Sequence, residues 1–589
     1  MQDLPETSPA TAPIVASLAG LSLDDFFEAS WKQLRLRDPA SITYDGLAEE
    51  YGVRNDQLND LSDAFIRETQ DLEVAILHLL RAYDRESLTP EQQISFDVYE
   101  WYLDNRVRGH EFMYHNYTVY HYLNSYHDEL ERLLTEIHPI TSKEDAEDYV
   151  SRLSQVDDQV DQLMEGLEQR EEIGVIPPDF IIEQAIGVMK RYLRMYSPDP
   201  ALIKAQSLSV YTVFEEKLAG LNDVSAEEKD ALLNAALAAI QESFIPAYVK
   251  IIEHLEHLAT IATDDAGVWK FPDGDAYYAY MLRDQTSTDL TPQEIHELGL
   301  AEVERVQAEM RQAFDELGYS SDANLNELLN VATDTGGYYD ISSQAGKEQL
   351  IQAHETLIAD IDQRLDQVFD IHPQAEVVVV GGPMGGYYVQ GAKDGSRPGA
   401  YHVSTAGSWV SKMYMASVTY HESIPGHHFQ IAIAQEMDLP TFRNDIFLNG
   451  YGEGWALYAE RLAWELGIYD DNPHGNLGRL YFELLRAVRL VVDTGIHSLR
   501  WTRGEARQYM VKILGSYGEV DRYIVMPAQA TGYKVGMIKI LELRQRAMDQ
   551  LGDQFDIKEF HRVVVGNGSM PLEILERVVD EYIEAKLNQ

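Results

Sequence analysis

The chain has 589 residues, of which 45% are hydrophobic and 10% aromatic. This composition excludes a disordered chain, and the length exceeds one simple core, so we expect two or three closely packed subdomains. The 47 basic and 98 acidic residues give a net charge of −51. Nucleic acids and anionic lipids bind through Lys and Arg, so this charge argues against both as partners.

Two absences narrow the chemistry further. The chain contains no cysteine, which excludes disulfides, thiolate metal ligands and cysteine nucleophiles, so any metal must be held by His, Asp or Glu. No stretch approaches the ~20 continuous apolar residues of a membrane-spanning helix, and we expect no membrane insertion. Nothing in the sequence sets an oligomeric state.

Residues 1–20 read as a flexible leader. The segment Gln2–Pro13 is rich in Pro, Thr, Ser and Ala and lacks an apolar signal core. It is typical of what remains after a signal peptide is removed. We therefore favour an exported protein, periplasmic or on the cell surface, with a cytoplasmic location as the alternative.

Most of the chain predicts helix. Apolar residues recur at helical spacing over 21–37, 62–83, 142–169 and 226–260. Farther on, Thr291-Pro292-Gln293-Glu294 combines an N-cap, a first-turn proline and a capping-box glutamate, which starts a long helix running through Leu317. We divide the chain near residue 285, into an N-terminal helical subdomain, 21–285, and a catalytic subdomain, 286–589.

One region predicts strands. Glu376–Val380 is β-branched and ends in Gly381-Gly382-Pro383, while Tyr387–Gln390 and Ala400–Ser404 could form two more strands around the turn residues 394–399. The glycines lack the Gly-Lys-Ser/Thr ending of a phosphate loop and do not match the dinucleotide fingerprint. A small β-sheet just before the His-Glu segment is the better interpretation.

That segment is His421-Glu422-Ser423-Ile424-Pro425-Gly426-His427-His428. A hydrolytic zinc site needs three protein ligands, an open position for water and a carboxylate to take the water's proton. The usual spacing places two histidines one helical turn apart. Here His427 comes six residues after His421, a rotation of ~600°, while His428 shares a face with His421 but lies ~10 Å along the axis.

Pro425 and Gly426 supply a remedy, because proline breaks the helical hydrogen-bond ladder and glycine permits unusual dihedrals. If these two residues bulge out, His427 takes the position of the second ligand. A three-residue bulge would select His428 instead. We prefer His427 and keep His428 as the alternative.

The third ligand is expected from a following helix. Gly450-Tyr451-Gly452 opens a helix that begins with Glu453, and Glu460 shares its face. We choose Glu453 as the ligand because the flanking glycines would let its backbone pack close to the metal helix. Glu460 is then a group that supports a ligand, or a salt-bridge partner.

A second His-Glu pattern occurs at His110-Glu111-Phe112-Met113-Tyr114-His115. It lies in a tyrosine-rich segment that continues through His121 and His127, without Gly or Pro to bend a helix. We interpret these histidines as packed, hydrogen-bonded core residues, with a metal site as the weaker alternative.

The sequence His421 to Gln430 resembles the signature of a bacterial family catalogued as domain of unknown function 885. Further similar segments follow in order over most of the chain: Asp394–Gly399, Glu453–Ala456, Arg489–His497, Arg522-Tyr523, Pro527–Gln529 and Tyr533–Gly536. The resemblance implies a mainly α, zincin-like helical metallopeptidase fold with the small β-sheet next to the metal-binding helices. This implied fold is similar to that of carboxypeptidase Taq, thimet oligopeptidase and angiotensin-converting enzyme. The resemblance also implies Zn²⁺ held by two His and a Glu.

The resemblance directs attention to a polar stripe on one helix. Arg486, Arg489, Asp493 and His497 step by three, four and four residues among apolar neighbours. Buried charges must be paired, so the stripe faces either a cleft beside the metal or an ion-pair network bracing the metal helix. Among its members, His497 is the one that we expect to touch substrate or transition state.

Other candidates lie outside this stripe. Related enzymes stabilise the oxyanion with Tyr or His, which makes Tyr533 a candidate, with a packed core tyrosine as the alternative. Arg522 could hold a substrate carboxylate, because guanidinium pairs bidentately with carboxylates. The strand around Tyr401 and His402 could bind an extended peptide by strand addition.

Together these features predict zinc-dependent hydrolysis of short or extended peptides. Zinc on His421, His427 and Glu453 would polarise water and carbonyl, with Glu422 as general base and Tyr533 or His497 stabilising the oxyanion. Two alternatives remain: a zinc hydrolase of a non-peptide amide, and a non-catalytic binding or scaffold protein that retains the fold. The sequence does not distinguish exopeptidase from endopeptidase action.

Overall fold

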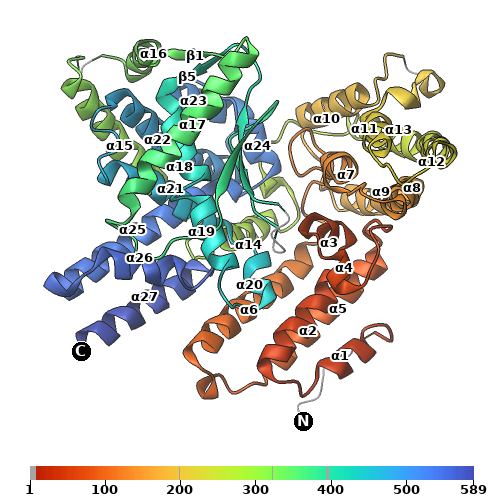
Figure 1. Ribbon diagram of the computed structural model, residues 1–589, viewed down its shortest axis with the longest axis horizontal. Helices are drawn as coiled ribbons and strands as arrows, with labels where there is room; N and C mark the ends of the chain where they lie inside the picture. Colours follow the sequence, from red (N-terminus) through yellow and green to blue (C-terminus); the bar gives the residue numbers. More distant parts are fainter. Residues whose placement is uncertain (1–7, 198, 321–322, 393–396, 589) are drawn as a thin grey trace. The chain divides into compact units, whose positions relative to one another are not determined.

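The computed structural model describes residues 8–197, 199–320, 323–392 and 397–588 (Figure 1). Helices account for 68% of the structure and strands for 4%, which confirms a mainly α fold with small sheets. The chain forms two compact units. The N-terminal unit comprises 1–83 and 103–274, and the C-terminal unit comprises 84–102 and 275–589.

In the described part of the N-terminal unit, all regular secondary structure is helical. Its elements are α1 Ala12–Leu18, α2 Leu23–Arg35, α3 Pro39–Asp45, α4 Ala48–Tyr51, α5 Asp63–Leu80, η2 His110–Phe112, α7 Tyr126–Arg132, η3 Leu133–Ile137, α8 Lys143–Ser154, α9 Val156–Glu172, α10 Asp179–Tyr192, η4 Pro200–Leu202, η5 Ala205–Ser207, α11 Ser209–Ala219, α12 Ala226–Ala239, η6 Ile240–Phe244, α13 Ile245–Leu258 and η7 Val268–Lys270. The four helical stretches expected here are observed. The expected helix over 142–169 divides at Gln155 into α8 and α9.

Helices α12 and α13 join through the π turn η6 into one run, Ala226–Leu258. By length and composition this run is apolar enough to cross a membrane, and 56% of its most apolar window is buried. Its Ala236, Ile240, Phe244 and Ile251 belong to the hydrophobic core of the unit. Packing in that core explains its composition.

The C-terminal unit carries the sheets and most of the long helices. Helix α6, Pro90–Gly109, crosses from this unit into the other. The remaining elements are η1 Arg85–Ser87, α14 Gly274–Thr286, α15 Pro292–Glu316, α16 Leu325–Gly336, α17 Gln344–Leu365, α18 Lys412–Glu422, α19 His427–Gln435, α20 Thr441–Asp445, α21 Asn449–Glu465, α22 Pro473–His497, α23 Arg503–Leu514, α24 Val520–Val525, η8 Gln529–Thr531, α25 Gly532–Leu551, η9 Gly552–Gln554, α26 Ile557–Val565 and α27 Leu572–Leu587. The capping box of Thr291 and Glu294 is present at the start of α15.

The three predicted strands form one sheet. Strand β4, Gly399–Ser404, lies between β2, Val377–Gly382, to which it is parallel, and β3, Tyr387–Val389, to which it is antiparallel. A second, two-stranded sheet was not predicted from the sequence. It consists of β1, Tyr338–Asp340, and β5, Trp409–Ser411. Residues 394–396 of the predicted turn lie outside the described residues. In Figure 1 the strands run beside α17 and α18.

The position of β4 corrects one expectation. Its backbone pairs with β2 on one side and with β3 on the other. No free edge remains at Tyr401 and His402 for an extended peptide to join. Strand addition at these residues is therefore wrong.

Candidate metal centre

The helix that carries the first histidine ends at the residue after it. Helix α18 stops at Glu422 and α19 begins at His427, so Ser423–Gly426 form the non-helical bulge that the sequence predicted. A Cβ on Gly426 would lie 2.0 Å from the carbonyl oxygen of His421, so only glycine fits. The indole Nε1 of Trp455 donates to the Pro425 carbonyl over 2.8 Å and holds the bulge.

Three side chains converge at this bulge. One ligand atom each from His421, His427 and Glu453 lies within 4.8 Å of the others. The Glu453 Oε2 atom is 3.2 Å from Nε2 of His421 and 3.4 Å from Nε2 of His427. Two ligands bound ~2.1 Å from a tetrahedral ion stand about 3.4 Å apart. The donor set and its spacing fit a zinc ion.

The neighbouring histidine faces away from this cluster. His428 Nε2 pairs with the carbonyl of Ala375 over 2.9 Å, and its Nδ1 pairs with the Tyr388 hydroxyl over 3.0 Å. Both ring nitrogens are therefore engaged elsewhere. The alternative that placed His428 in the cluster does not match the geometry.

Glu460 supports the first ligand. Its Oε1 accepts a hydrogen bond from His421 Nδ1 over 2.9 Å, and Ser417 donates to its other oxygen. A carboxylate on Nδ1 fixes the ring orientation and directs Nε2 at the cluster. The position of Glu460, one face with Glu453 on α21, gives it this role instead of that of a ligand.

The glycines near Glu453 pack differently from the expectation. A Cβ on Gly454 would lie 2.5 Å from the Cα of Gly536 in α25, and one on Gly452 would meet the Phe447 ring at 2.8 Å. These glycines therefore bring α21 close to α25 and to Phe447, not to the metal helix. Close packing of α21 against α25 does place Glu453 near Tyr533, one turn before Gly536.

The cluster stabilises positive charge. Burial alone would lower the pKa of His421, but the hydrogen bonds that its ring donates to Glu453 and Glu460 raise it to about 9. Burial opposes the ionisation of Glu453, yet the charges of His427 and His421 hold its pKa well below the ordinary value. A divalent cation among these side chains would take the place of the imidazolium charge.

Glu422 lies beside the cluster. It is 7% exposed, and burial, which outweighs the charges of His421 and His427, raises its pKa. Tyr401 stands close enough for the Glu422 charge to add to burial in raising the tyrosine pKa. Tyr401 is 2% exposed, and its ring meets that of His354 edge-on. His402, the next residue on β4, instead stacks on Tyr387 at 4.6 Å.

Tyr533 also reaches the cluster. Its ring lies nearly parallel to that of His421, with centroids 6.2 Å apart. Burial first, and the charge of Glu453 second, raise the pKa of Tyr533. Arg522 points a guanidinium nitrogen at its hydroxyl over 3.5 Å and donates to Gln529 over 2.6 Å. Both residues therefore lie at the site where the sequence placed them.

The position of His497 does not fit the role that the sequence suggested for it. It lies eight residues beyond Arg489 on α22, about 12 Å farther along the helix. Its side chain has no exposed surface, its Nε2 pairs with the Tyr523 carbonyl over 2.9 Å, and its ring lies against Tyr278. A substrate cannot reach it in this conformation, so the expected catalytic role does not fit the structure. Its neighbour Asp493 accepts hydrogen bonds from Tyr278 and the Ala528 amide.

Arg486 is the residue whose importance the sequence understated. It appeared only as the first member of the polar stripe. Its guanidinium lies 3.9 Å from Glu460 and over the ring of Tyr533, and its charge acts on Glu422. The signal that could have singled it out is its spacing from Arg489, which puts both side chains on the face of α22 that meets the metal helices.

The histidines of the N-terminal unit form no such cluster among the described residues. His110 Nε2 pairs with Glu73 over 2.6 Å, and Glu73 is itself paired with Arg106 over 2.8 Å. His115 Nε2 pairs with the Pro272 carbonyl over 2.9 Å. Hydrogen bonding accounts for both rings.

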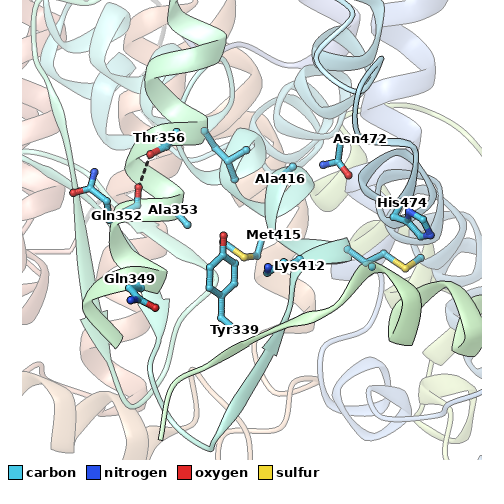
Figure 2. A pocket seen from close by; sticks show the side chains of 13 residues that line it. Tyr339, Gln349, Gln352, Ala353, Thr356, Lys412, Met415, Ala416, Asn472 and His474 are labelled. Carbon is cyan, nitrogen blue, oxygen red and sulfur yellow. Dashed lines mark hydrogen bonds between the residues drawn. The ribbon is translucent and has the colours of Figure 1, made fainter. Parts of the chain in front are cut away.

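A cavity of about 580 Å³ lies along the other half of α18 (Figure 2). Tyr339 of β1, Gln349 and Gln352 of α17, Lys412 of α18 and His474 of α22 line it. None of the three cluster residues belongs to its lining. Lys412 comes nine residues before His421, about 13 Å along the helix, so this cavity is separate from the candidate metal centre.

Comparison with known proteins places the chain in a family. Residues 39–579 match a family described as a bacterial protein of unknown function, DUF885. A solved structure described as a candidate lipoprotein from Colwellia psychrerythraea is 30% identical, with a TM-score of 0.89 over 96% of this chain and 99% of that chain. None of the curated proteins matches.

Two further solved structures are more distant. A candidate lipoprotein of unknown function from Shewanella oneidensis is 16% identical, with a TM-score of 0.74 over 95% of this chain and 100% of that chain. An oligoendopeptidase F candidate from Bacillus anthracis is 12% identical over 87% of this chain and 95% of that chain, with a TM-score of 0.28. The family match spans most of the chain, and the chain therefore belongs to the DUF885 family of bacterial proteins.

Proposed function

We propose that the protein is a zinc-dependent peptide hydrolase with a zincin-like active site. The observation that carries this proposal is the convergence of His421, His427 and Glu453 on one point, beside the buried carboxylate of Glu422. Two imidazoles and one carboxylate are a common catalytic zinc set, and they leave one coordination position open.

In the proposed peptide hydrolysis, each side chain of the site has a separate role. Zinc, when bound, supplies the Lewis acidity that polarises the scissile carbonyl and lowers the pKa of water. Glu422 takes the proton of the attacking water and delivers it to the leaving amine nitrogen. Tyr533 donates its hydroxyl hydrogen to the oxygen of the tetrahedral intermediate. Glu460 keeps His421 in the tautomer that presents Nε2.

The arginines near Tyr533 are the candidate substrate contacts, whereas Tyr401 is buried. Tyr401 lies beside Glu422 from the sheet side, and Arg522 lies beside Tyr533 from the helical side. Peptides are the proposed substrates, because a carbonyl flanked by a proton donor and a carboxylate base suits amide hydrolysis.

Metal analysis of the purified protein, with peptide-library digestion of the same samples, tests this function. We expect about one zinc per chain and cleavage of peptides. Both should disappear in His427→Ala and Glu453→Ala. The matched control is His428→Gln, which alters the adjacent ring outside the cluster and should keep zinc and activity.

Other outcomes point elsewhere. Wild-type protein without zinc, even after zinc is supplied, would overturn the proposal and favour a binding or scaffold protein. Zinc bound by the wild type and lost in both variants, with no peptide cleaved, would favour a hydrolase of non-peptide amides. Zinc retained in His427→Ala but lost in the His428 variant would move the ligand to His428.

We further propose that the protein is exported. The description of the Colwellia relative as a candidate lipoprotein supports this location, whereas the expected flexible leader contains the helix α1 with buried Val15 and Leu18. Fractionation of cells that express the full-length gene tests it. Recovery in the cytoplasmic fraction alone would contradict it.

A further inference from the structure

Three arginines meet around the hydroxyl-bearing ring of Tyr533. The guanidinium carbons of Arg489 and Arg486 lie 4.7 Å and 5.7 Å from the ring centroid, and Arg522 lies 3.5 Å from the hydroxyl. Arg486 and Arg489 come from α22, whereas Arg522 comes from α24. We name Arg486, Arg489 and Arg522 the arginine cluster.

Fewer carboxylates than guanidinium groups lie within ion-pair distance in this cluster. Glu519 pairs with Arg489 over 2.7 Å and also stands 3.7 Å from Arg522, so one negative charge serves two guanidinium groups. Arg486 has its nearest ion-pair partner, Glu460, at 3.9 Å. Glu460 already accepts from His421 and Ser417. Within ion-pair distance, the three guanidinium groups therefore share two carboxylates among the described residues.

Donor groups are left in excess as well. Arg486 Nε, Arg489 Nη1 and Arg522 Nε are buried and have no hydrogen-bond partner among the described residues. The side chains of Arg486 and Arg489 are 10% and 5% exposed. A buried guanidinium with unused N–H groups is costly unless an acceptor arrives. An anionic ligand would supply both the charge and the acceptors.

The arginine cluster borders the reacting groups. Tyr533 stacks on the ligand His421, and the charge of Arg486 acts on Glu422. An anion held here would be part of the molecule undergoing hydrolysis, because Tyr533 faces the metal ligands on one side and the arginines on the other. Guanidinium groups pair best with planar carboxylates, through two parallel hydrogen bonds.

We infer that the arginine cluster binds a carboxylate of the substrate, and that the expected carboxylate is the free C-terminus of a short peptide. The enzyme would then act as an exopeptidase that cleaves near the C-terminal end. This inference rests on the proposed function, since it assigns the substrate class of the same site. An acidic side chain next to the scissile bond offers the same chemistry and is distinguished below.

The test compares matched peptides that differ only in the C-terminal group. For the zinc-loaded wild type, we expect kcat/KM to be at least about 10-fold higher for the free acid than for the C-terminal amide. Arg486→Met should abolish this ratio, and Arg486→Lys should restore it in part, because lysine keeps the charge without the bidentate geometry. A general loss of catalysis would lower both rates and leave the ratio unchanged.

A control variant and a third peptide complete this experiment. Lys412→Met removes a positive charge from the separate cavity on α18 and should leave the acid-to-amide ratio unchanged. An amidated peptide with Asp beside the scissile bond distinguishes the source of the carboxylate. Preference for that peptide over the free acid would assign the arginine cluster to acidic side chains. Equal rates for all three peptides would overturn the inference and leave the proposed function intact.

A binding measurement makes the inference independent of turnover. Calorimetry on zinc-loaded Glu422→Gln protein would use an N-acetylated dipeptide acid and its amide. Tighter binding of the acid, lost in Glu422→Gln with Arg486→Met, would support the carboxylate site even if the wild type cleaved no peptide. Equal binding of acid and amide would overturn it, whatever the fate of the proposed function.

Discussion

Two segments of this molecule begin with His-Glu and reach another histidine within six residues, yet they behave differently. In the N-terminal unit, His110 pairs with Glu73, whose charge Arg106 already neutralises, and His115 is satisfied by a backbone carbonyl. In the C-terminal unit, His421 and His427 face one another with a carboxylate between them. A metal centre requires donors that share one unfilled point, and hydrogen bonds that satisfy each donor separately prevent it.

The largest expected difference between the two segments concerns the glutamate that follows the first histidine. We predict that Glu422→Gln lowers kcat by about 10²–10⁴-fold while zinc content is unchanged, because the general base is lost and the ligands remain. Glu111→Gln, at an exposed position in the other segment, should leave kcat unaltered. Steady-state kinetics with metal analysis checks both variants. Full activity of Glu422→Gln would remove the catalytic distinction between the segments.

A tyrosine accompanies each segment and offers the next contrast. We predict that Tyr533→Phe lowers kcat by about 10²–10³-fold with little change in KM, because the hydroxyl acts on the oxyanion. Tyr114 donates to Asp63 over 2.7 Å, so Tyr114→Phe should cost stability and not activity. Thermal unfolding and kinetics on the same preparations separate the two effects. A KM effect alone in Tyr533→Phe would assign this hydroxyl to substrate binding.

Each segment also has a carboxylate hydrogen-bonded to its first histidine. We predict that Glu460→Gln weakens zinc affinity by about 10–100-fold, since a neutral amide orients His421 and raises its basicity less well. Glu73→Gln should leave zinc affinity unchanged and lower the unfolding temperature of the protein, because Arg106 loses its buried partner. Competition with a chelator measures the affinity. Equal zinc affinity in wild type and Glu460→Gln would show that Glu460 does not tune the metal.

The smallest effect concerns pH and the last histidine of the N-terminal segment. His127 is buried beside Ser125, and burial lowers its pKa to about 4. The unfolded state then binds the proton more readily, so stability falls as pH drops through the ordinary value near 6.5. Other buried histidines add to the same effect, so we predict that the loss of stability between pH 7 and 5 is about 2 kcal/mol smaller in His127→Gln than in wild type. Denaturant titration at the two pH values, on wild type and variant, checks it. An identical loss in both proteins would exclude His127 as its source.

Local patterns in the sequence predicted the elements and the ligand set of the site. The β-branched run at Val377–Val380 and the Pro425-Gly426 break are signals that act on their own backbone. Counting residues per turn led to a helical bulge and to a preference for His427 over His428, and the cluster contains His427. Glu453 followed from the need for a third donor on a neighbouring helix.

The remaining features depend on contacts between distant segments. Nothing local shows that Gly454 meets Gly536, that β1 pairs with β5, or that β4 is enclosed on both sides. His497 shares a helical face with Arg489, but helical spacing does not say how far along the axis the site extends. The unpartnered guanidinium nitrogens of the arginine cluster become apparent only when its contacts are examined in three dimensions.

The contact between Gly454 and Gly536 limits how this site can diverge. The helix with Glu453 and the helix with Tyr533 touch through backbone atoms, so their separation does not depend on any side chain that could be trimmed or enlarged by degrees. A single methyl group at either position would displace Glu453 and Tyr533 together. Change in substrate preference should therefore arise on the arginine side of Tyr533, where side chains alone define the surface, while the spacing between the two helices stays fixed.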